Sequence, residues 1–198
     1  MGEFVEGFEF LADLKKEVTF FGSARIDPKH RCYREARKLA RMLGEAGFTI
    51  ITGGGPGIME AGNRGAHDVD AESVGLNIQL PQEQRTNRYV RRAMGFYYFF
   101  TRKVMLSVSA QAYIFFPGGF GTLDEMFEML MLIQTKKMSP LPIVLVGRDF
   151  WESLFDWSQK HQLPSGYIDP ADLKIFKIVD TAEEAFKIVT KSRERTIF

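Results

Sequence analysis

The sequence predicts an α/β protein with a Rossmann-like, doubly wound parallel sheet and helices on both faces. Three observations support this prediction: strand-like and helical segments alternate along the chain, several strands are apolar throughout, and short glycine-bearing turns follow three of them. Strands without a polar face are typical of parallel sheets, because crossover helices cover both sides. Ligands of such sheets bind beyond the carboxyl ends of the strands, so a functional site is expected there.

The expected elements alternate from residue 18 onward. Apolar runs predict six strands, in VTFFGSAR, FTIITGGG, ESVGLNIQL, AYIFFPGG, PIVLVG and LKIFKIV. Helical spacing predicts the helices between and after them, in YREARKLARMLGEAG, PGIMEAGNRGAHD, TRKVMLSVS, TLDEMFEML, residues 151–160 and TAEEAFKIVTKSR. The basic segment before TRKVMLSVS is expected to be irregular.

Length and composition favour one domain. The chain has 198 residues, of which 45% are hydrophobic, enough for a sizeable core. Phe4, Phe8 and Leu11 recur at helical spacing and predict an amphipathic helix in residues 1–17. We expect this helix to be an extension outside the core, packed on a single nucleotide-binding domain over residues 18–198.

The charge balance gives no sign of a nucleic-acid or membrane partner. The net charge is +1, from 26 basic and 25 acidic residues. The single cysteine, Cys32, excludes an internal disulfide, and no early apolar run is long enough for a signal peptide or a membrane span. The sequence therefore predicts a soluble cytoplasmic protein.

Three glycine-bearing turns follow predicted strands, at Gly22, at 53–57 and at 117–122. Glycines let backbone amides approach a ligand, and a helix N-terminus adds free N–H groups, so phosphate is the expected guest. Each turn alone could equally be a tight connection. The second turn is not a P-loop, since no Gly-Lys-Ser/Thr follows, and Glu60 stands where a dinucleotide fingerprint needs glycine or alanine.

The acids that follow the third turn have two interpretations. Thr122 and Glu125 have the spacing of a capping box, and Asp124 would suit the helix dipole. A carboxylate at this place would also lie within reach of a ribose whose phosphate rests on the helix amides. Capping leaves unexplained why the loop before it carries so little side chain.

Residues 85–103 combine six basic residues with six aromatic ones and contain no acid. Such a mixture can bind single-stranded nucleic acid. A compact site for one nucleotide explains it more simply, with an arginine for charge and an aromatic ring for the base. Most of the aromatics are expected in the core, whereas Arg102 and Lys103 begin a helix near the predicted pocket.

The motifs GGGPGIMEAGNRGA, FFTRK and PGGFGTLDE, in this order, resemble the Lonely Guy (LOG) family of cytokinin riboside 5'-monophosphate phosphoribohydrolases. Many of its members carry the label "possible lysine decarboxylase". The resemblance covers about residues 18–160, and GLNIQLPQEQRTN and IQTKK resemble the longer bacterial branch. The label has no support here, because no lysine stands in a recognisable Schiff-base setting with a partner for a pyridine nitrogen.

The resemblance implies hydrolysis of the N-glycosidic bond of a nucleoside 5'-monophosphate, AMP or an N6-modified relative, to free base and ribose 5-phosphate. It implies neither a metal nor an organic cofactor. The family's catalytic arginine and glutamate match Arg102 and Glu125, which would act on an oxocarbenium-like sugar. The candidate substrate-binding residues are Gly22, Ser23, Gly54, Gly55, Met59, Glu60, Asn63, Asn87, Lys103, Pro117, Gly118, Gly119, Gly121 and Thr122.

The helix after the third turn is apolar nearly all round. Leu123, Met126, Phe127 and Leu130 are expected to face the core, yet the apolar surface continues through residues 129–133. A helix of this kind must be covered on every side. The cover is expected to be a second subunit, in a homodimer or an assembly of dimers, or else the N-terminal helix.

Three other functions remain open at this stage. A non-catalytic carrier of nucleotides or of molybdenum cofactor could use the same fold, but it would not need the pair formed by Arg102 and Glu125. A nicotinamide-dinucleotide protein lacks support because the third glycine is missing. Single-strand nucleic-acid binding would require strong salt dependence.

Overall fold

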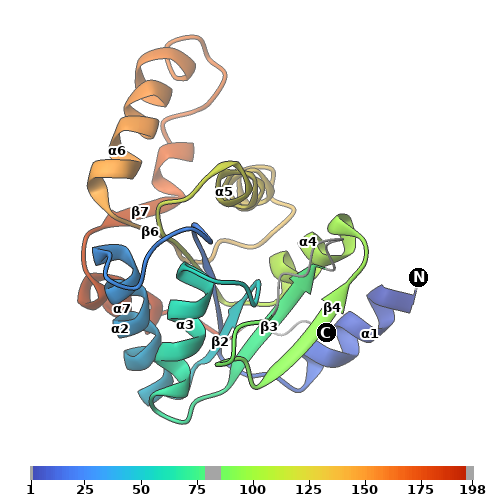
Figure 1. Cartoon of the computed structure of the whole chain (residues 1–198). Helices are drawn as coiled ribbons and strands as arrows, with labels where there is room; N and C mark the ends of the chain where they lie inside the picture. Colours follow the sequence, from blue (N-terminus) through green and yellow to red (C-terminus); the bar gives the residue numbers. More distant parts are fainter. Residues whose placement is uncertain (1, 79–85, 195–198) are drawn as a thin grey trace.

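A computed structural model describes residues 2–78 and 86–194 of the protein (Figure 1). These residues contain a seven-stranded sheet, all of whose neighbouring strands run parallel, in the order β4-β3-β2-β1-β5-β6-β7. The strands are β1 (Glu17–Phe21), β2 (Thr49–Thr52), β3 (Ser73–Ile78), β4 (Arg92–Phe96), β5 (Ala112–Phe115), β6 (Ile143–Val146) and β7 (Phe176–Val179). The predicted Rossmann-like fold class is therefore confirmed.

Helices connect and cover these strands (Figure 1). The α-helices are α1 (Gly2–Ala12), α2 (Arg31–Glu45), α3 (Ile58–His67), α4 (Phe99–Val108), α5 (Phe120–Gln134), α6 (Arg148–Trp157) and α7 (Ala182–Val189). A π-helical turn (Ser158–Gln162) extends α6, and a 3₁₀ turn (Asp172–Lys174) precedes β7. Figure 1 shows α6 projecting from the body of the molecule.

The order of the strands places a topological switch point between β1 and β5. From β1 the chain adds β2, β3 and β4 on one side, and then returns to add β5, β6 and β7 on the other. The loops that leave β1 and β5 therefore diverge at their carboxyl ends. Crevices at such points are where open parallel sheets bind ligands.

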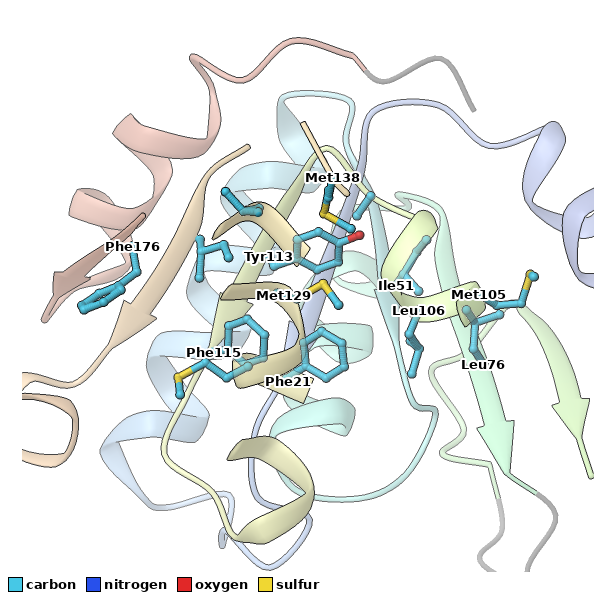
Figure 2. Close-up of a cluster of buried hydrophobic side chains, with 14 of the residues drawn as sticks. Phe21, Ile51, Leu76, Met105, Leu106, Tyr113, Phe115, Met129, Met138 and Phe176 are labelled. Carbon is cyan, nitrogen blue, oxygen red and sulfur yellow. The ribbon is translucent and has the colours of Figure 1, made fainter. Parts of the chain in front are cut away.

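The strands alternate their side chains between two hydrophobic cores. In β1, Phe20 packs under α2, α3 and α7, whereas Phe21 packs on the opposite face under α4, α5 and α6. Figure 2 shows the second cluster, where Phe21, Tyr113 and Phe115 meet Met129 of α5. The Phe21 and Phe115 rings stack with centroids 4.8 Å apart. This packing joins the switch-point strands to the helix that follows β5.

Strand β4 was not predicted, because the segment 85–103 was expected to be irregular. It pairs with β3 in the register Val74↔Arg92 to Ile78↔Phe96 and forms one edge of the sheet. Only Phe96 is buried among its five residues, so an edge position left little apolar signal. The predicted third strand ends at Ile78, and the remaining two residues of that prediction, together with Arg85, lie outside the described residues.

The N-terminal helix contributes to the core, contrary to the prediction. Helix α1 packs on α4 and β4, and Leu11 and Leu14 are buried within the second cluster. The Glu3 carboxylate accepts hydrogen bonds from the Tyr97 N–H at 2.6 Å and the Thr101 hydroxyl at 2.5 Å. These bonds attach α1 to the beginning of α4. The amphipathic pattern predicted the helix correctly but gave no indication of its partners.

The buried face of α5 differs from the predicted one. Met126 is buried as expected, but Met129 and Ile133 complete the apolar part of the buried stripe, while Phe127 is 43% exposed. Thr122 and Glu125 also lie on the buried side. Two polar side chains therefore face inward near the N-terminus of α5.

Candidate active site

A cavity of about 650 Å³ opens at the carboxyl ends of β1 and β2, beside the N-terminus of α5. It occupies the switch point, where a ligand site is expected. Its volume lies within the usual range for small-molecule pockets. It is lined by Phe20, Phe21, Gly22, Ser23, Ala24, Arg25, Gly53, Met59, Phe99, Arg102, Lys103, Gly119, Phe120, Gly121, Thr122, Asp124 and Glu125.

The three glycine turns are held against one another by the backbone. The Ser23 N–H donates to the Pro117 carbonyl at 3.1 Å, and the Ile58 N–H donates to the Ser23 carbonyl at the same distance. Gly57 has φ +67°, and a Cβ there would collide with the Ser23 carbonyl. Gly57 is therefore required at this position, because any side chain would separate the first two turns.

Helix α5 begins at Phe120 with Gly119 as its N-cap, and no side chain of the described chain caps it. The predicted capping box of Thr122 and Glu125 is therefore wrong: both residues lie inside the helix. The third glycine turn leads directly into α5, so the first N–H groups of this helix are open to the cavity. A capping box does occur at α7, between Thr181 and Glu184.

Gly118 and Thr122 fit tightly together under this turn. A Cβ on Gly118 would collide with the Thr122 hydroxyl group and come within 3.0 Å of the Ser23 nitrogen. Thr122 is 8% exposed. The absence of a side chain at Gly118 therefore lets the α5 N-terminus approach the β1 turn.

The Glu125 carboxyl group is buried without a full set of partners. Glu125 is 8% exposed, and its Oε2 has no hydrogen-bond partner among the described residues. Burial raises its pKa to about 7, although the nearby charges of Lys103 and Arg102 act in the opposite direction. A buried carboxyl with an unsatisfied oxygen costs folding free energy, which indicates a functional role.

Two cations reach this part of the cavity from the first turn of α4. The Arg102 Nε donates to the Leu76 carbonyl at 2.8 Å, and the guanidinium lies so close to Gly53 that a Cβ there would collide with it. Burial lowers the pKa of Arg102, and the charge of Glu125 partly offsets this. Arg102 is thus held in place beside the second glycine turn.

Lys103 is held by two carboxylates of α5. Its Nζ lies 2.7 Å from an Asp124 oxygen and 3.1 Å from a Glu128 oxygen. These ion pairs join α4 to the second and third turns of α5. They also occupy the ammonium group that was expected to contact substrate.

Most predicted site residues line this cavity. Both expected catalytic residues do so, together with the candidate binding residues Gly22, Ser23, Met59, Lys103, Gly119, Gly121 and Thr122. Of the other candidates, none appears among the described lining residues: these are Gly54, Gly55, Glu60, Asn63, Asn87, Pro117 and Gly118. The structure does not bring these seven to the cavity surface.

The two asparagines support the second glycine turn from behind. Asn63 is fully buried, accepts from the Thr52 hydroxyl at 2.7 Å and donates to the Ser73 hydroxyl at 2.9 Å. The Asn87 Nδ2 donates to Asn63 Oδ1 at 2.9 Å and to the Gly55 carbonyl at 3.0 Å. These amides are already hydrogen-bonded inside the protein, and their contact with substrate stays a prediction.

Glu60, Gly54 and Pro117 also serve the scaffold. A Glu60 oxygen accepts from the Tyr33 hydroxyl at 2.8 Å. Gly54 has φ +73° and lies against the Asn77 side chain, where a Cβ would not fit. The Pro117 carbonyl accepts from Ser23. The binding of substrate by these three residues stays a prediction.

Several lining residues were not predicted, notably Arg25, Phe99 and Phe120. Phe99 and Phe120 are 60% and 93% exposed. Each is adjacent or close in sequence to a predicted site residue. Their positions next to the motifs were the available signal.

The described residues contain no group of three or more His, Cys, Asp and Glu side chains placed to hold a metal ion. Among the helices in the described ranges, none combines the length and apolar character needed to cross a membrane.

A family model described as "Possible lysine decarboxylase" matches residues 59–189, well over half of the chain. The chain belongs to this family. The match confirms the resemblance to the LOG family, whose motifs surround the cavity. The chain is therefore related to enzymes of that family.

Curated relatives in the LOG family include plant proteins. A probable cytokinin riboside 5'-monophosphate phosphoribohydrolase of Oryza sativa subsp. japonica is 29% identical, over 75% of this chain and 61% of its own length. A cytokinin riboside 5'-monophosphate phosphoribohydrolase of Arabidopsis thaliana is 27% identical, over 87% of this chain and 80% of its own. The chain thus matches less than two thirds of the rice protein.

Solved structures with this fold come from several kinds of protein. A molybdenum cofactor carrier protein of Chlamydomonas reinhardtii has a TM-score of 0.66 at 18% identity, with 89% of this chain and 97% of that chain covered. A molybdenum cofactor binding protein of Rippkaea orientalis has a TM-score of 0.65 at 18% identity, with 88% of this chain and 93% of that chain covered. DNA processing protein A of Helicobacter pylori has a TM-score of 0.60 at 13% identity, with 91% of this chain and 83% of that chain covered. These similarities show the fold alone.

The raised pKa of the buried Glu125 predicts how the stability of this LOG-family protein depends on pH. Its pKa is about 7 in the folded chain and near 4.5 in the unfolded chain, so the folded state binds more protons between these values. The contribution of this group to the free energy of unfolding is therefore full below pH 4.5 and falls as the pH rises to about 7. Between pH 5 and pH 8, we expect the free energy of unfolding of Glu125→Gln to rise by about 2 kcal/mol relative to that of the wild type.

Urea unfolding of both proteins at pH 5 and pH 8 measures this difference. Comparing the two proteins at each pH removes the contributions of all other titrating groups. A difference that does not change with pH would show that Glu125 titrates normally in the fold.

Proposed function

We propose that the protein hydrolyses the N-glycosidic bond of a purine nucleoside 5'-monophosphate to a free base and ribose 5-phosphate. The observation that carries this proposal is the Glu125 Oε2, which has no hydrogen-bond partner among the described residues and belongs to a side chain that lines the cavity within two turns of the N-terminus of α5. The family's named activity supports it. A phosphate at the helix N-terminus would bring a ribose toward this acid.

The geometry suggests a role for each end of the cavity. Free N–H groups at residues 119–122 would bind the phosphate oxygens of the substrate. The Glu125 carboxylate would stabilise the oxocarbenium-like sugar or accept a proton from the attacking water. A pKa of about 7 is suited to a general base at neutral pH. Arg102, fixed through Leu76, would stabilise charge on the nucleotide as the bond breaks.

The main alternative is a non-catalytic carrier of the same fold, because structural relatives include molybdenum cofactor carriers. A carrier has no need of a buried, unpaired carboxylate beside an arginine. That feature costs stability, and catalysis offers a reason for it. A DNA-binding relative with this fold exists, but the net charge of +1 gives no general attraction for nucleic acid.

A panel of nucleoside 5'-monophosphates tests the proposal. Purified protein would be incubated with AMP, GMP, IMP, CMP, UMP and N6-isopentenyl-AMP, and the released base measured by chromatography. The matching nucleosides serve as controls for the need for phosphate. Release of base from at least one purine monophosphate supports the proposal, and no release from any purine monophosphate contradicts it.

We also propose that a second copy of the chain covers the outer face of α5. Phe127 and Met131 are 43% and 47% exposed there, and Trp157, the last residue of α6, is 52% exposed. Helix α1 packs on α4 and β4, so it does not serve as the expected alternative cover. Exposed apolar side chains that share one face of a helix are typical of an interface between subunits.

We expect the protein to be a dimer or an assembly of dimers in light scattering. A double substitution, Phe127→Glu with Met131→Glu, should shift it to a monomer, because charges would be buried in the interface. Val5→Glu is the control, since Val5 is 56% exposed on α1. A monomeric wild-type protein at micromolar concentration would remove this proposal.

Two further proposals concern the domain structure and the cellular location of the protein. We propose that residues 18–198 form one catalytic domain to which residues 1–17 attach. A cytoplasmic location would match the intracellular supply of nucleotides.

A further inference from the structure

Three cationic side chains of the described residues line the cavity, and two of them are already engaged. The Lys103 ammonium lies between Asp124 and Glu128. The Arg102 guanidinium donates through Nε to the Leu76 carbonyl and packs on Gly53. Lys103 cannot turn toward a new anion without breaking the ion pairs that join α4 to α5, and Arg102 is held beside the second glycine turn by its bond to Leu76.

Arg25 differs from both. Its main-chain N–H donates to the Ser23 hydroxyl at 3.1 Å, but within residues 2–78 and 86–194 its guanidinium makes no hydrogen bond or ion pair. The residue is exposed and lines the cavity. It is thus a cation at the site with its full donor capacity unused.

The backbone places Arg25 close to the α5 N-terminus. Arg25 follows Ser23 by two positions, and the Ser23 N–H is bonded to the carbonyl of Pro117, at the start of the turn that leads into α5. The open N–H groups of that turn and the Arg25 side chain therefore border the same cavity.

A second observation indicates that this cavity holds a ligand. Glu125 is more than nine-tenths buried, lines the same cavity, and keeps one oxygen without a partner in the described structure. A buried acceptor of this kind requires a hydrogen-bond donor, such as a sugar hydroxyl or a water. The ligand should therefore carry a donor group about one sugar away from its anionic end.

We propose that Arg25 is the side chain that binds the phosphate monoester of the substrate, opposite the N–H groups of α5, and that Lys103 instead positions the acids of α5. This inference rests on the proposed function, since it assigns the phosphate end of that substrate. A guanidinium can donate two parallel hydrogen bonds to a phosphate, and a helix N-terminus binds the remaining oxygens. The exposed side chain would move onto the ligand when it binds.

The first test separates binding from chemistry. Arg25→Gln should raise KM for the best nucleoside monophosphate at least tenfold and lower kcat no more than a few fold. The preference for monophosphate over nucleoside, as a ratio of kcat/KM values, should fall at least tenfold. Arg25→Lys should recover part of the loss, because lysine restores the positive charge but cannot donate two parallel hydrogen bonds as a guanidinium does.

Arg41→Gln is the matched control, because Arg41 is an exposed arginine of α2 that pairs with Glu45 and does not line the cavity. It should behave as the wild type in every assay. Thermal unfolding of each variant shows whether the fold is kept. Unchanged KM and unchanged phosphate preference in a folded Arg25→Gln protein would overturn the inference.

A binding experiment keeps the inference separate from the proposed function. Titration calorimetry with ribose 5-phosphate should show at least tenfold weaker binding to Arg25→Gln than to the wild type. This result would support the Arg25 assignment even if no nucleotide were hydrolysed, in which case only the proposed reaction fails. Equal binding to both proteins, or none to the wild type, would overturn the Arg25 assignment even if the reaction is observed.

Discussion

Replacing Glu125 with glutamine is expected to lower kcat at least a thousandfold while nucleotide affinity stays within a few fold. The amide keeps the size of the side chain but removes the negative charge that would stabilise a cationic sugar or take a proton from water. Because the carboxylate would act mainly in the transition state, the loss should appear in kcat and not in KM. Single-turnover assays with the best substrate from the panel measure it.

Asp124→Asn is the control for this substitution. Asp124 is the neighbouring acid of α5, its side chain is 61% exposed, and it pairs with Lys103. Its loss should reduce kcat by less than about tenfold, since exposed ion pairs contribute little. Wild-type turnover by Glu125→Gln would remove Glu125 from the mechanism.

Replacing Arg102 with lysine should lower kcat/KM about a hundredfold or more. The guanidinium reaches the cavity while its Nε is tied to the Leu76 carbonyl, a geometry that an ammonium group cannot reproduce. Removal of one positioned donor from a charge-stabilising site typically costs two to three orders of magnitude in rate. Steady-state kinetics over a range of substrate concentrations gives the value.

The stability of this variant must be measured with its activity, because the bond to Leu76 also joins α4 to β3. Urea unfolding should show a loss of about 1 kcal/mol, the usual net value of one hydrogen bond. A folded Arg102→Lys protein with wild-type kcat/KM would contradict the catalytic assignment. Activity that falls only in parallel with unfolding would contradict it as well.

The parallel sheet could be predicted from the sequence because strands buried on both faces have no polar side. The residues of β1, β2, β5 and β6 are all buried, and each of these strands was predicted. Edge strand β4 carries two exposed and two partly exposed residues, so its pattern resembled that of a loop. Burial on both faces therefore made the central strands recognisable, whereas β7 at the other edge was recognised from its apolar residues.

The beginning of α5 shows a different limit. Thr122 and Glu125 have the spacing of a capping box, but the same spacing fits any two residues one turn apart inside a helix. The glycine that precedes Phe120 can cap a helix with its backbone, which leaves no side-chain signature. The boundary could be decided only from the backbone.

Two candidate residues beside the second glycine turn show what spacing leaves undecided about a site. Asn63 and Asn87 are polar and close to a glycine motif, properties shared by binding residues and by residues that support a turn. The difference depends on which way each side chain points. That orientation follows from contacts between α3, β3 and the segment before β4, which are distant from one another in sequence.

The junction of the two half-sheets has a consequence for synthesis of the chain. Central strand β1 completes its pairing only when β5 arrives, in the register Val18↔Ala112 to Phe21↔Phe115. On the ribosome, the first three strands emerge long before that partner, which leaves an apolar edge unpaired in the meantime. Nascent chains stalled before residue 112 should therefore bind chaperones or aggregate, and slower translation downstream of β3 should lower the yield of native protein.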